Sequence, residues 1–345
     1  MNAPIMPVDA LRAGRTANSD PVRDPADGTD DHKENIRHDI NDRILGCLIG
    51  GAAGDALGYS VEFSSYASII TKYGEDGITA YSVDPVSSKA LISDDTQMTL
   101  FTAEGLLNQG GDTVENIYKS YKNWLTTQFT GFEDRPRGTG SALMERPELY
   151  SRRAPGNTCV DSLSSGMMGS VSYPINRSKG CGGVMRVSSI AFLKENGLFE
   201  ADKLAARAAA ITHGHALGYL PAALLVHIIH KIIYENVGDR LLPELIDESV
   251  GEFGEHFAEA PCMSDLISIV SKAITLSAND RADVDNINEL GQGWVAEETL
   301  AIAIYCALRH QNDFSSGIVA AVNHDGDSDS TGEVAGSILG AYLGA

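Results

Sequence analysis

The sequence has few cysteines and few basic residues, and each shortage excludes a class of protein. Its five cysteines include no C-x-x-C pair, which favours a reducing compartment, here the cytoplasm, in which thiols serve as small apolar residues. Asp and Glu outnumber Lys and Arg by 47 to 26, and the formal net charge is -21. A broad nucleic-acid surface or a contact with an anionic membrane needs clustered cations. We therefore expect neither nucleic acid nor membrane as a partner.

Long apolar runs, strand patterns and aromatic residues are also scarce. The N-terminus has no apolar run of the signal-peptide type. The most apolar stretch, residues 216–233, contains Pro221, His227, His230 and Lys231, and so predicts a buried amphipathic helix rather than a membrane span. Aromatic residues make up only 7% of the chain, whereas glycine is frequent with 35 residues. This composition favours close packing of helices.

The chain divides into an N-terminal arm and a compact part. Residues 1–38 are poor in large apolar residues and contain four prolines, so we predict a flexible arm. Residues 39–345 show apolar residues at helical spacing, which predicts an all-α fold with a single compact multi-helix domain. The first pattern starts near Ile40 and carries several glycines, which indicate close approach to another backbone. Further helices are predicted over about 97–108, 113–125, 201–211, 216–234, 241–254, 264–276, 295–309, 314–322 and 331–343, with a long ordered loop over 136–159.

Two acidic clusters carry the strongest signal for chemistry. The first acidic cluster is Ser93–Thr96 and the second acidic cluster is Asp325–Thr331. Taken alone, the first has the composition of a helix N-cap and the second that of a solvated turn. The second also resembles the start of an EF-hand calcium loop, but Glu333 and an apolar helix follow it in place of the closing ligand. Together, carboxylates and hydroxyls with no cysteine nearby form a hard-oxygen set suited to Mg²⁺ or Mn²⁺, if the two clusters meet.

Three further segments could contact a ligand. The glycine-rich loop Ser178–Arg186 exposes backbone N–H groups suited to phosphate, and Gly156–Thr158 is a second polar loop, although turns also need glycine. Residues Thr212–His215 include two histidines. Without further His or Cys ligands they speak against zinc and favour a capping or ligand-contacting role. Glu62 follows the first glycine-rich helix and by itself says little.

The order of these segments resembles the ADP-ribosylglycohydrolase family, the group that includes dinitrogenase reductase-activating glycohydrolase. No single segment is decisive, but the ordered set is specific and runs from about Arg43 to the C-terminus. The resemblance implies an all-α fold with two Mg²⁺ or Mn²⁺ ions held between helices. The matching segments are Gly46–Gly58, Glu62, Ser93–Thr96, Gly156–Thr158, Gly180–Arg186, Thr212–His213, Gly293–Glu298 and Asp327–Ser330.

The resemblance also implies roles for individual residues. Both clusters usually carry Thr in the family where this chain has Ser93 and Ser330, and serine keeps the hydroxyl ligand. Some relatives have Asn in place of Cys181, and Glu62 matches a family Glu near the metals and the distal ribose. The implied metal ligands are Ser93, Asp94, Asp95, Asp327, Asp329 and Ser330. The implied substrate-binding residues are Asn157, Ser178, Lys179, Gly180, Cys181, Gly182, Gly183 and His213.

The expected reaction follows from these roles. Cleavage of an N-glycosidic bond develops positive charge at the anomeric carbon of ribose, so it needs a fixed ribose and an activated water. Two metal ions can orient ribose hydroxyls and lower the pKa of a bound water, whose proton Glu62 or Asp94 can take. The resemblance thus implies a metal-dependent hydrolase that removes ADP-ribose from a modified protein side chain. The acidic site favours arginine, and O-linked ADP-ribose, as on serine, or a free ADP-ribosyl metabolite is the alternative.

The arm raises a second class of function, that of a binding protein. Its scattered apolar residues could anchor in a groove of a partner, and its excess of Asp would suit a basic groove that holds anionic NAD in an ADP-ribosyltransferase toxin. The protein would then be an immunity protein that reverses the modification and also blocks the toxin. The simpler interpretation is a plain N-terminal tail. An inactive relative that only binds is disfavoured, because the ligand set is intact.

Overall fold

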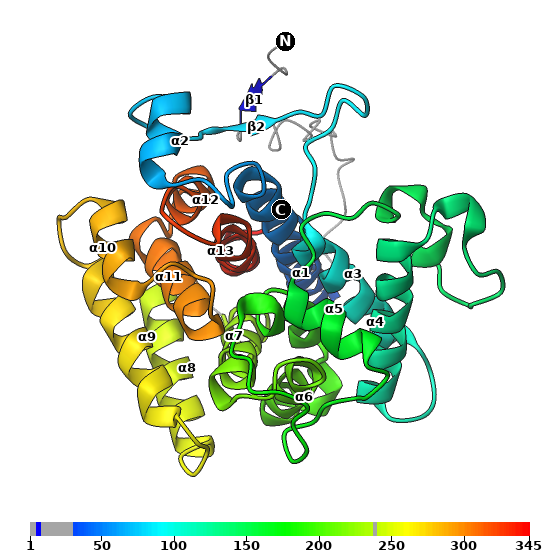
Figure 1. Cartoon of the computed structure of the whole chain (residues 1–345). Coiled ribbons are helices and arrows are strands. Elements are labelled where there is room, and N and C mark those ends of the chain that lie inside the picture. The colour runs from blue at the N-terminus through cyan, green and yellow to red at the C-terminus, as the bar shows by residue number, and fades with distance from the viewer. Residues whose placement is uncertain (1–4, 8–29, 237–239) are drawn as a thin grey trace.

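The computed structural model describes residues 5–7, 30–236 and 240–345 (Figure 1). Almost all regular structure in these residues is helical, so the predicted all-α class is confirmed. The strands and α-helices are β1 (Ile5–Pro7), α1 (Asp30–Gly58), α2 (Tyr66–Tyr73), β2 (Ala80–Ser82), α3 (Asp94–Leu107), α4 (Thr113–Phe129), α5 (Asn157–Ser164), α6 (Leu198–Ala210), α7 (Ala216–Tyr234), α8 (Leu242–His256), α9 (Met263–Ser277), α10 (Asp283–Leu290), α11 (Ala296–Arg309), α12 (Phe314–Val322) and α13 (Ser328–Leu343).

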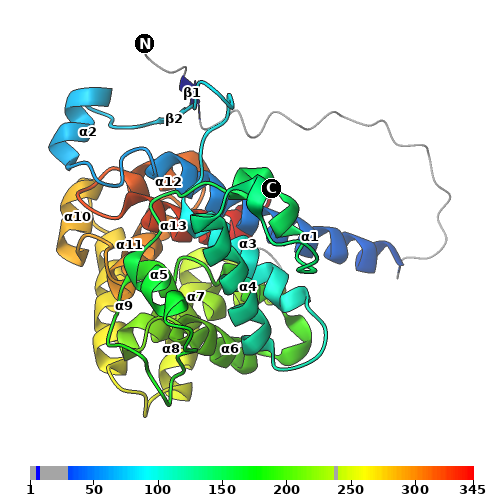
Figure 2. The same ribbon diagram turned by 45° about the vertical axis from the view of Figure 1, so that its right-hand side comes forward.

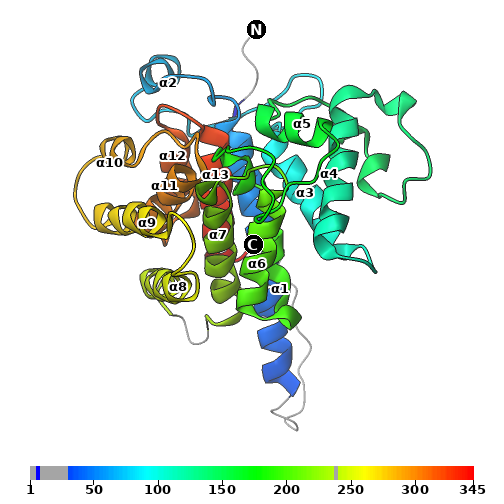
Figure 3. The same ribbon diagram turned by 60° about the horizontal axis from the view of Figure 1, so that its bottom comes forward.

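Helices α1 and α13 form the central pair of the molecule, and glycine allows their backbones to touch. A Cβ atom added to Gly50 would overlap the carbonyl oxygen of Gly336, and Gly46 and Gly54 meet the backbone of α13 in the same way. Figures 1 and 3 show α13 lying against α1 in the middle of the helices. The predicted close approach is therefore confirmed. It also sets the C-terminal end of α1 beside Ser328, at the start of α13.

The apolar helix α7 is buried from Ala216 to Ile233. It is long and apolar enough to cross a membrane by length and composition, but all of the apolar window lies inside the molecule. The prediction of burial was right and that of an amphipathic helix was wrong, because neighbouring helices cover every face. His227 and His230 are packed inside it. Around this core, α8 to α10 lie on one side of the molecule and α3 to α5 on the other (Figure 1).

Three short helices escaped the sequence analysis: α2, α5 and α10, each of eight residues. The predicted loop over 136–159 in fact contains two 3₁₀ helices, Leu143–Glu145 and Pro147–Leu149, and the start of α5. A helix of about two turns shows too little periodicity to be detected and depends on tertiary packing for its stability.

The predicted arm, residues 1–38, is only partly described. Residues 5–7 form β1, which pairs antiparallel with β2 so that Ile5 lies opposite Ser82. Residues 30–38 are the first turns of α1, which therefore begins earlier than the sequence suggested and projects beyond the other helices (Figure 2). Residues 1–4 and 8–29 lie outside the described residues, so the flexibility of the arm and its binding of a transferase stay predictions.

Candidate active site

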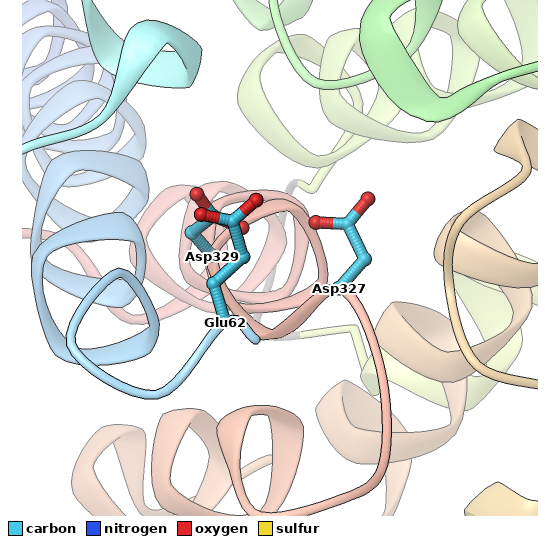
Figure 4. Close-up of side chains that lie close together, drawn as sticks. All are labelled: Glu62, Asp327 and Asp329. Carbon is cyan, nitrogen blue, oxygen red and sulfur yellow. The ribbon is translucent and has the colours of Figure 1, made fainter. Parts of the chain in front are cut away.

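The fold brings the two acidic clusters and Glu62 together. The first acidic cluster opens α3, where Ser93 caps the helix by accepting a hydrogen bond from the Asp95 N–H at 3.2 Å. The second acidic cluster leads into α13, and Glu62 follows α1. Glu62, Asp327 and Asp329 are buried and each offers a carboxylate oxygen within 4.8 Å of the others. Figure 4 shows the three carboxylates converging from the loop after α1 and the start of α13.

These carboxylates line a cavity of about 700 Å³. Its wall also contains the loop before α5, the glycine loop and the segment before α11, which supplies Trp294. Eleven of the fifteen residues predicted for the site lie in this wall: Glu62, Asp94, Asp95, Asn157, Gly180, Cys181, Gly182, His213, Asp327, Asp329 and Ser330.

Four predicted residues lie outside the wall. Ser93 is fully buried behind it, next to Asp329. Gly183 is buried against the backbone of Gly218. Ser178 shares a hydrogen bond with Thr158 at 3.2 Å, and Lys179 forms an ion pair with Glu297. Contact of these four with a substrate or a metal stays a prediction, and their observed contacts are those of a supporting layer.

Burial and mutual repulsion dominate the electrostatics of the cavity. Burial, and then the charges of Asp329, Asp327 and Asp94, raise the pKa of Glu62 to about 10. Burial is also the first cause that raises the pKa of Asp95 and Asp327 well above its usual range, with the charge of Asp329 next. Carboxylates arranged in this way need a cation or protons to coexist.

Several of the carboxylates at the cavity have an oxygen atom without a hydrogen-bond partner among the described residues. Within the described chain, Glu62 Oε2, Asp95 Oδ2 and Asp327 Oδ2 are buried and have no hydrogen-bond partner. Unpaired buried oxygens are costly, and hard divalent cations are bound by such groups. The donor set therefore fits Mg²⁺ or Mn²⁺. No histidine belongs to the cluster of ligand atoms found among the described residues, so zinc is a poor fit.

Asp55 supports the candidate site from behind the cavity wall, and the sequence analysis did not single it out. It is fully buried on α1 and accepts hydrogen bonds from the Ser93 N–H at 2.9 Å and the Thr96 N–H at 3.1 Å, and a third from the Thr96 hydroxyl. Burial, and then the charge of Asp329, raise the pKa of Asp55 to about 7. Asp55 thus fixes the first acidic cluster to α1. The available signal was an acidic residue within an apolar, glycine-rich helix.

An aromatic pair at the cavity was also missed. The rings of Phe63 and Trp294 stack with their centroids 5.9 Å apart and an interplanar angle of 18°. Phe63 is 77% exposed and Trp294 is 40% exposed, although both line the cavity. The Trp294 carbonyl accepts a hydrogen bond from the Cys181 N–H at 3.3 Å. The pair therefore forms an apolar rim beside Glu62.

The two histidines near the glycine loop have separate roles. His215 caps α7, since its Nδ1 accepts a hydrogen bond from the Leu217 N–H at 3.1 Å. His213 lines the cavity and is 1% exposed. Burial, and then the charge of Arg186, lower the pKa of His213 to about 3. His213 is therefore a neutral imidazole at physiological pH, able to donate or accept a hydrogen bond but not to supply positive charge.

Comparison with known proteins gives one consistent result. The family described as ADP-ribosylglycohydrolase matches residues 36–345. The ADP-ribosylhydrolase ARH3 of Bos taurus is 26% identical over 88% of this chain and 85% of its own length. The ADP-ribosyl-[dinitrogen reductase] glycohydrolase of Rhodospirillum rubrum is 24% identical over 88% of this chain and 87% of its own length. A solved structure titled ADP-ribosylglycohydrolase-related protein complex superposes with a TM-score of 0.57 at 25% identity, covering 89% of each chain.

Proposed function

The chain belongs to the ADP-ribosylglycohydrolase family and is a hydrolase of ADP-ribose linkages; from this premise we propose that its substrate is an ADP-ribosylated arginine side chain of a protein and that it works with two Mg²⁺ or Mn²⁺ ions. The observation that carries the metal proposal is the buried group of Glu62, Asp327 and Asp329 within 4.8 Å of one another. The unpaired oxygens of Asp95 and Asp327 support it. The proposed metal ligands are Ser93, Asp94, Asp95, Asp327, Asp329 and Ser330.

When bound, such ions would hold ribose hydroxyls and make a water more acidic. The protein itself would supply the base that accepts a proton from the attacking water, and Asp94 and Glu62 are the two candidates. Asp94 Oδ2 accepts a hydrogen bond from the Gly156 N–H at 3.1 Å, which ties Asp94 to the wall. Glu62 Oε2 has no partner among the described residues and Glu62 lines the cavity. Glu62 is therefore better placed than Asp94 to accept the proton of the attacking water, once cations offset the repulsion that raises its pKa.

The choice of arginine rests on the rim of the cavity. A guanidinium group is planar and cationic, and both acidic residues and aromatic faces attract it. The stacked pair of Phe63 and Trp294 lies beside the carboxylates and is exposed to an incoming protein. An O-linked substrate, as on serine, offers no cation to this rim. It is the second candidate, because the ADP-ribose half of the two substrates is the same.

The deciding experiment compares peptides that carry arginine-linked and serine-linked ADP-ribose, each with Mg²⁺, with Mn²⁺ and with EDTA. The proposal expects release of ADP-ribose from the arginine peptide, faster than from the serine peptide, and none in EDTA. Full activity in metal-free buffer would contradict the metal proposal. Faster release from serine would replace arginine with the alternative linkage and leave the hydrolase assignment intact.

A protective role in the cytoplasm against an ADP-ribosyltransferase toxin extends this proposal. It is supported by the activity, which reverses such a modification, and by five cysteines that are all free. Binding of the toxin by the arm depends largely on residues outside the described chain. A titration of a transferase with the full chain and with a chain lacking residues 1–29 tests it, and equal affinity for the two would contradict it.

A further inference from the structure

Arg186 is a fully buried cation that contacts an aromatic ring and backbone. Its guanidinium lies 4.4 Å above the ring of Tyr121 and donates a hydrogen bond to the Ala208 carbonyl at 3.2 Å. Among the residues that the structure describes, no carboxylate forms an ion pair with it. A buried charge without a counter-ion is costly. Its position behind Cys159 and His213, two residues of the cavity wall, suggests that the cost is linked to the site.

A chain of hydrogen bonds runs from Arg186 to the cavity. The guanidinium nitrogen of Arg186 lies 2.7 Å from Thr212 Oγ1, and that oxygen lies 2.8 Å from His213 Nδ1. A guanidinium can only donate, so Thr212 Oγ1 accepts from Arg186. The hydroxyl hydrogen of Thr212 is then left to be donated, and the Nδ1 lone pair of His213 is the strong acceptor within reach.

This direction of donation fixes the tautomer of His213. A neutral imidazole carries one N–H, so a ring that accepts at Nδ1 carries its hydrogen at Nε2. The opposite tautomer would make Thr212 Oγ1 accept twice and would leave its hydrogen only the weak sulfur acceptor of Cys159. The Nε2–H tautomer gives the Thr212 hydroxyl one donor, Arg186, and one acceptor, His213 Nδ1.

The Nε2 edge of His213 has no hydrogen-bond partner among the described residues. It faces the glycine loop: a Cβ atom added to Gly182 would lie 3.3 Å from Nε2, and one added to Gly180 would lie 3.4 Å from it. Both glycines line the same cavity. The two glycines therefore leave space beside the Nε2 atom of a buried side chain that lines the cavity.

We propose that Arg186 and Thr212 are positioning residues that hold His213 as its Nε2–H tautomer, so that the imidazole donates a hydrogen bond to an oxygen of bound ADP-ribose. The identity of this ligand rests on the proposed function, whereas the tautomer does not. Arg186 acts through Thr212 and touches no ligand. The guanidinium of Arg186 thus orients the Thr212 hydroxyl, and this hydroxyl holds the neutral His213 imidazole with its N–H at Nε2.

The test uses the substitution Thr212→Val, which removes the hydroxyl and keeps the shape of the side chain, with Thr212→Ser as the matched control that keeps the hydroxyl. Long-range ¹H–¹⁵N correlation spectra of the full chain report the tautomer of each histidine, and the His213 signals are those lost in His213→Gln. The wild-type and Thr212→Ser proteins should show the Nε2–H form. Thr212→Val should show a mixture or the opposite form.

Binding of ADP-ribose, measured by calorimetry in Mg²⁺ buffer, gives the second readout. Loss of one oriented hydrogen bond should weaken binding by Thr212→Val about tenfold and leave Thr212→Ser near wild type. An Nδ1–H form in the wild-type protein, or an unchanged tautomer in a folded Thr212→Val protein, would overturn the inference. If Thr212→Val does not fold, Thr212→Ala takes its place. A wild-type protein that binds no ADP-ribose would count against the proposed function, while the spectra of the free protein would still decide the tautomer.

Discussion

At the scale of single residues, the site separates groups that hold the wall from groups that are free to bind. The carboxylate oxygens of Asp55 accept hydrogen bonds from Ser93 and Thr96, whereas Asp327 has one buried oxygen without a partner in the described chain. The first acidic cluster is both a helix cap and part of the site, so the two interpretations of its sequence do not exclude each other. Acidic residues are also stable there because they face the positive end of the α3 dipole.

The first prediction concerns Asp327→Ala and Asp94→Ala. Each removes a proposed charged ligand and little core volume, so turnover should fall at least about 100-fold while the fold persists. Circular dichroism and a substrate assay on the same samples measure both effects. Asp247→Ala, an exposed change on α8, is the matched control and should retain activity. Near-normal turnover in both site variants would mean that the clusters only cap helices.

The second prediction concerns His230, which is buried in α7 with neither ring nitrogen hydrogen-bonded among the described residues. His230→Leu should raise the free energy of unfolding by about 1 kcal/mol at neutral pH, because an unpaired polar group is removed from the interior. Burial lowers the pKa of His230 from 6.5 to about 4. At this residue the unfolded chain therefore binds more protons in this window, so the contribution of His230 to the stability of the wild type falls as the pH falls from 6.5 to 4.

Urea unfolding of wild type and His230→Leu at pH 7 and at pH 5 measures this effect. The advantage of the variant should be larger at pH 5, since it lacks the group that must remain neutral in the folded state. A variant that is less stable at both values would show that the imidazole makes a favourable contact.

At the scale of elements, the packing of α1 against α13 positions the chemistry. The glycines of the two helices face each other along the contact, from Gly46 opposite Gly340 to Gly54 opposite Gly332. This contact places Asp55 and the loop that carries Glu62 close to the start of α13, where the second acidic cluster lies. The geometry of the proposed metal ligands is therefore set by how closely two backbones approach.

The third prediction compares Gly50→Ala with Gly251→Ala. A methyl group at Gly50 would overlap the Gly336 carbonyl, so the variant should lose about 1–3 kcal/mol of unfolding free energy, or more if the helices must separate. Gly251 lies in α8 with nothing within 4 Å of an added Cβ. Gly251→Ala should gain up to about 1 kcal/mol from helix propensity alone.

Thermal and urea unfolding of both glycine variants give these values. Activity of Gly50→Ala should fall with stability, because the shift of α1 also moves the Glu62 loop. Equal stability of the two variants would show that the close approach of α1 and α13 is not constrained by packing.

At the scale of the whole molecule, the net charge is -21, and the fold gathers several of the acidic side chains around one cavity. Carboxylates from α3, from the segment that begins α13 and from the loop that follows α1 line one cavity, and Asp55 of α1 lies buried behind the first acidic cluster. Self-repulsion of this kind destabilises the compact state unless cations or protons offset it. The stability of the molecule should therefore depend on metal and on pH together.

The fourth prediction follows from the raised pKa of Glu62, from 4.5 to about 10, and that of Asp55, from 3.8 to about 7. The folded state binds more protons than the unfolded state in these windows, so these groups lower the stability as the pH rises. Well above the ordinary histidine pKa of about 6.5, His213, His230 and His324, whose pKa burial lowers, are neutral in both states and no longer oppose this trend. Without metal, the melting temperature should thus fall between pH 7 and pH 9.

Scanning calorimetry with EDTA and with Mg²⁺ at both pH values measures the effect. Mg²⁺ should raise the melting temperature more at pH 9 than at pH 7, because more carboxylates are then free of protons. A melting temperature that is insensitive to Mg²⁺ at both values would exclude a metal site among these carboxylates.

The sequence by itself determined the class of fold and most of the residues that line the candidate site. Apolar spacing predicted the long helices, since each needs several turns on one buried face, and α12 was found with its observed bounds, Phe314–Val322. The acidic clusters and the glycine loop were visible because their composition is unusual over a few residues. Their order along the chain carried the family resemblance, and eleven of the predicted site residues line one cavity.

Only the tertiary structure decided which residues meet. Asp55 binds groups that lie 38 and 41 positions away in the chain, and Arg186 reaches His213 through Thr212. Local spacing contains no information on such distant partners. It also cannot reveal α2, α5 and α10, because two-turn helices are held by their neighbours rather than by their own pattern. Local sequence patterns therefore determined the long helices and the candidate residues, whereas the packing of α1 against α13 determined which of these residues meet in the site.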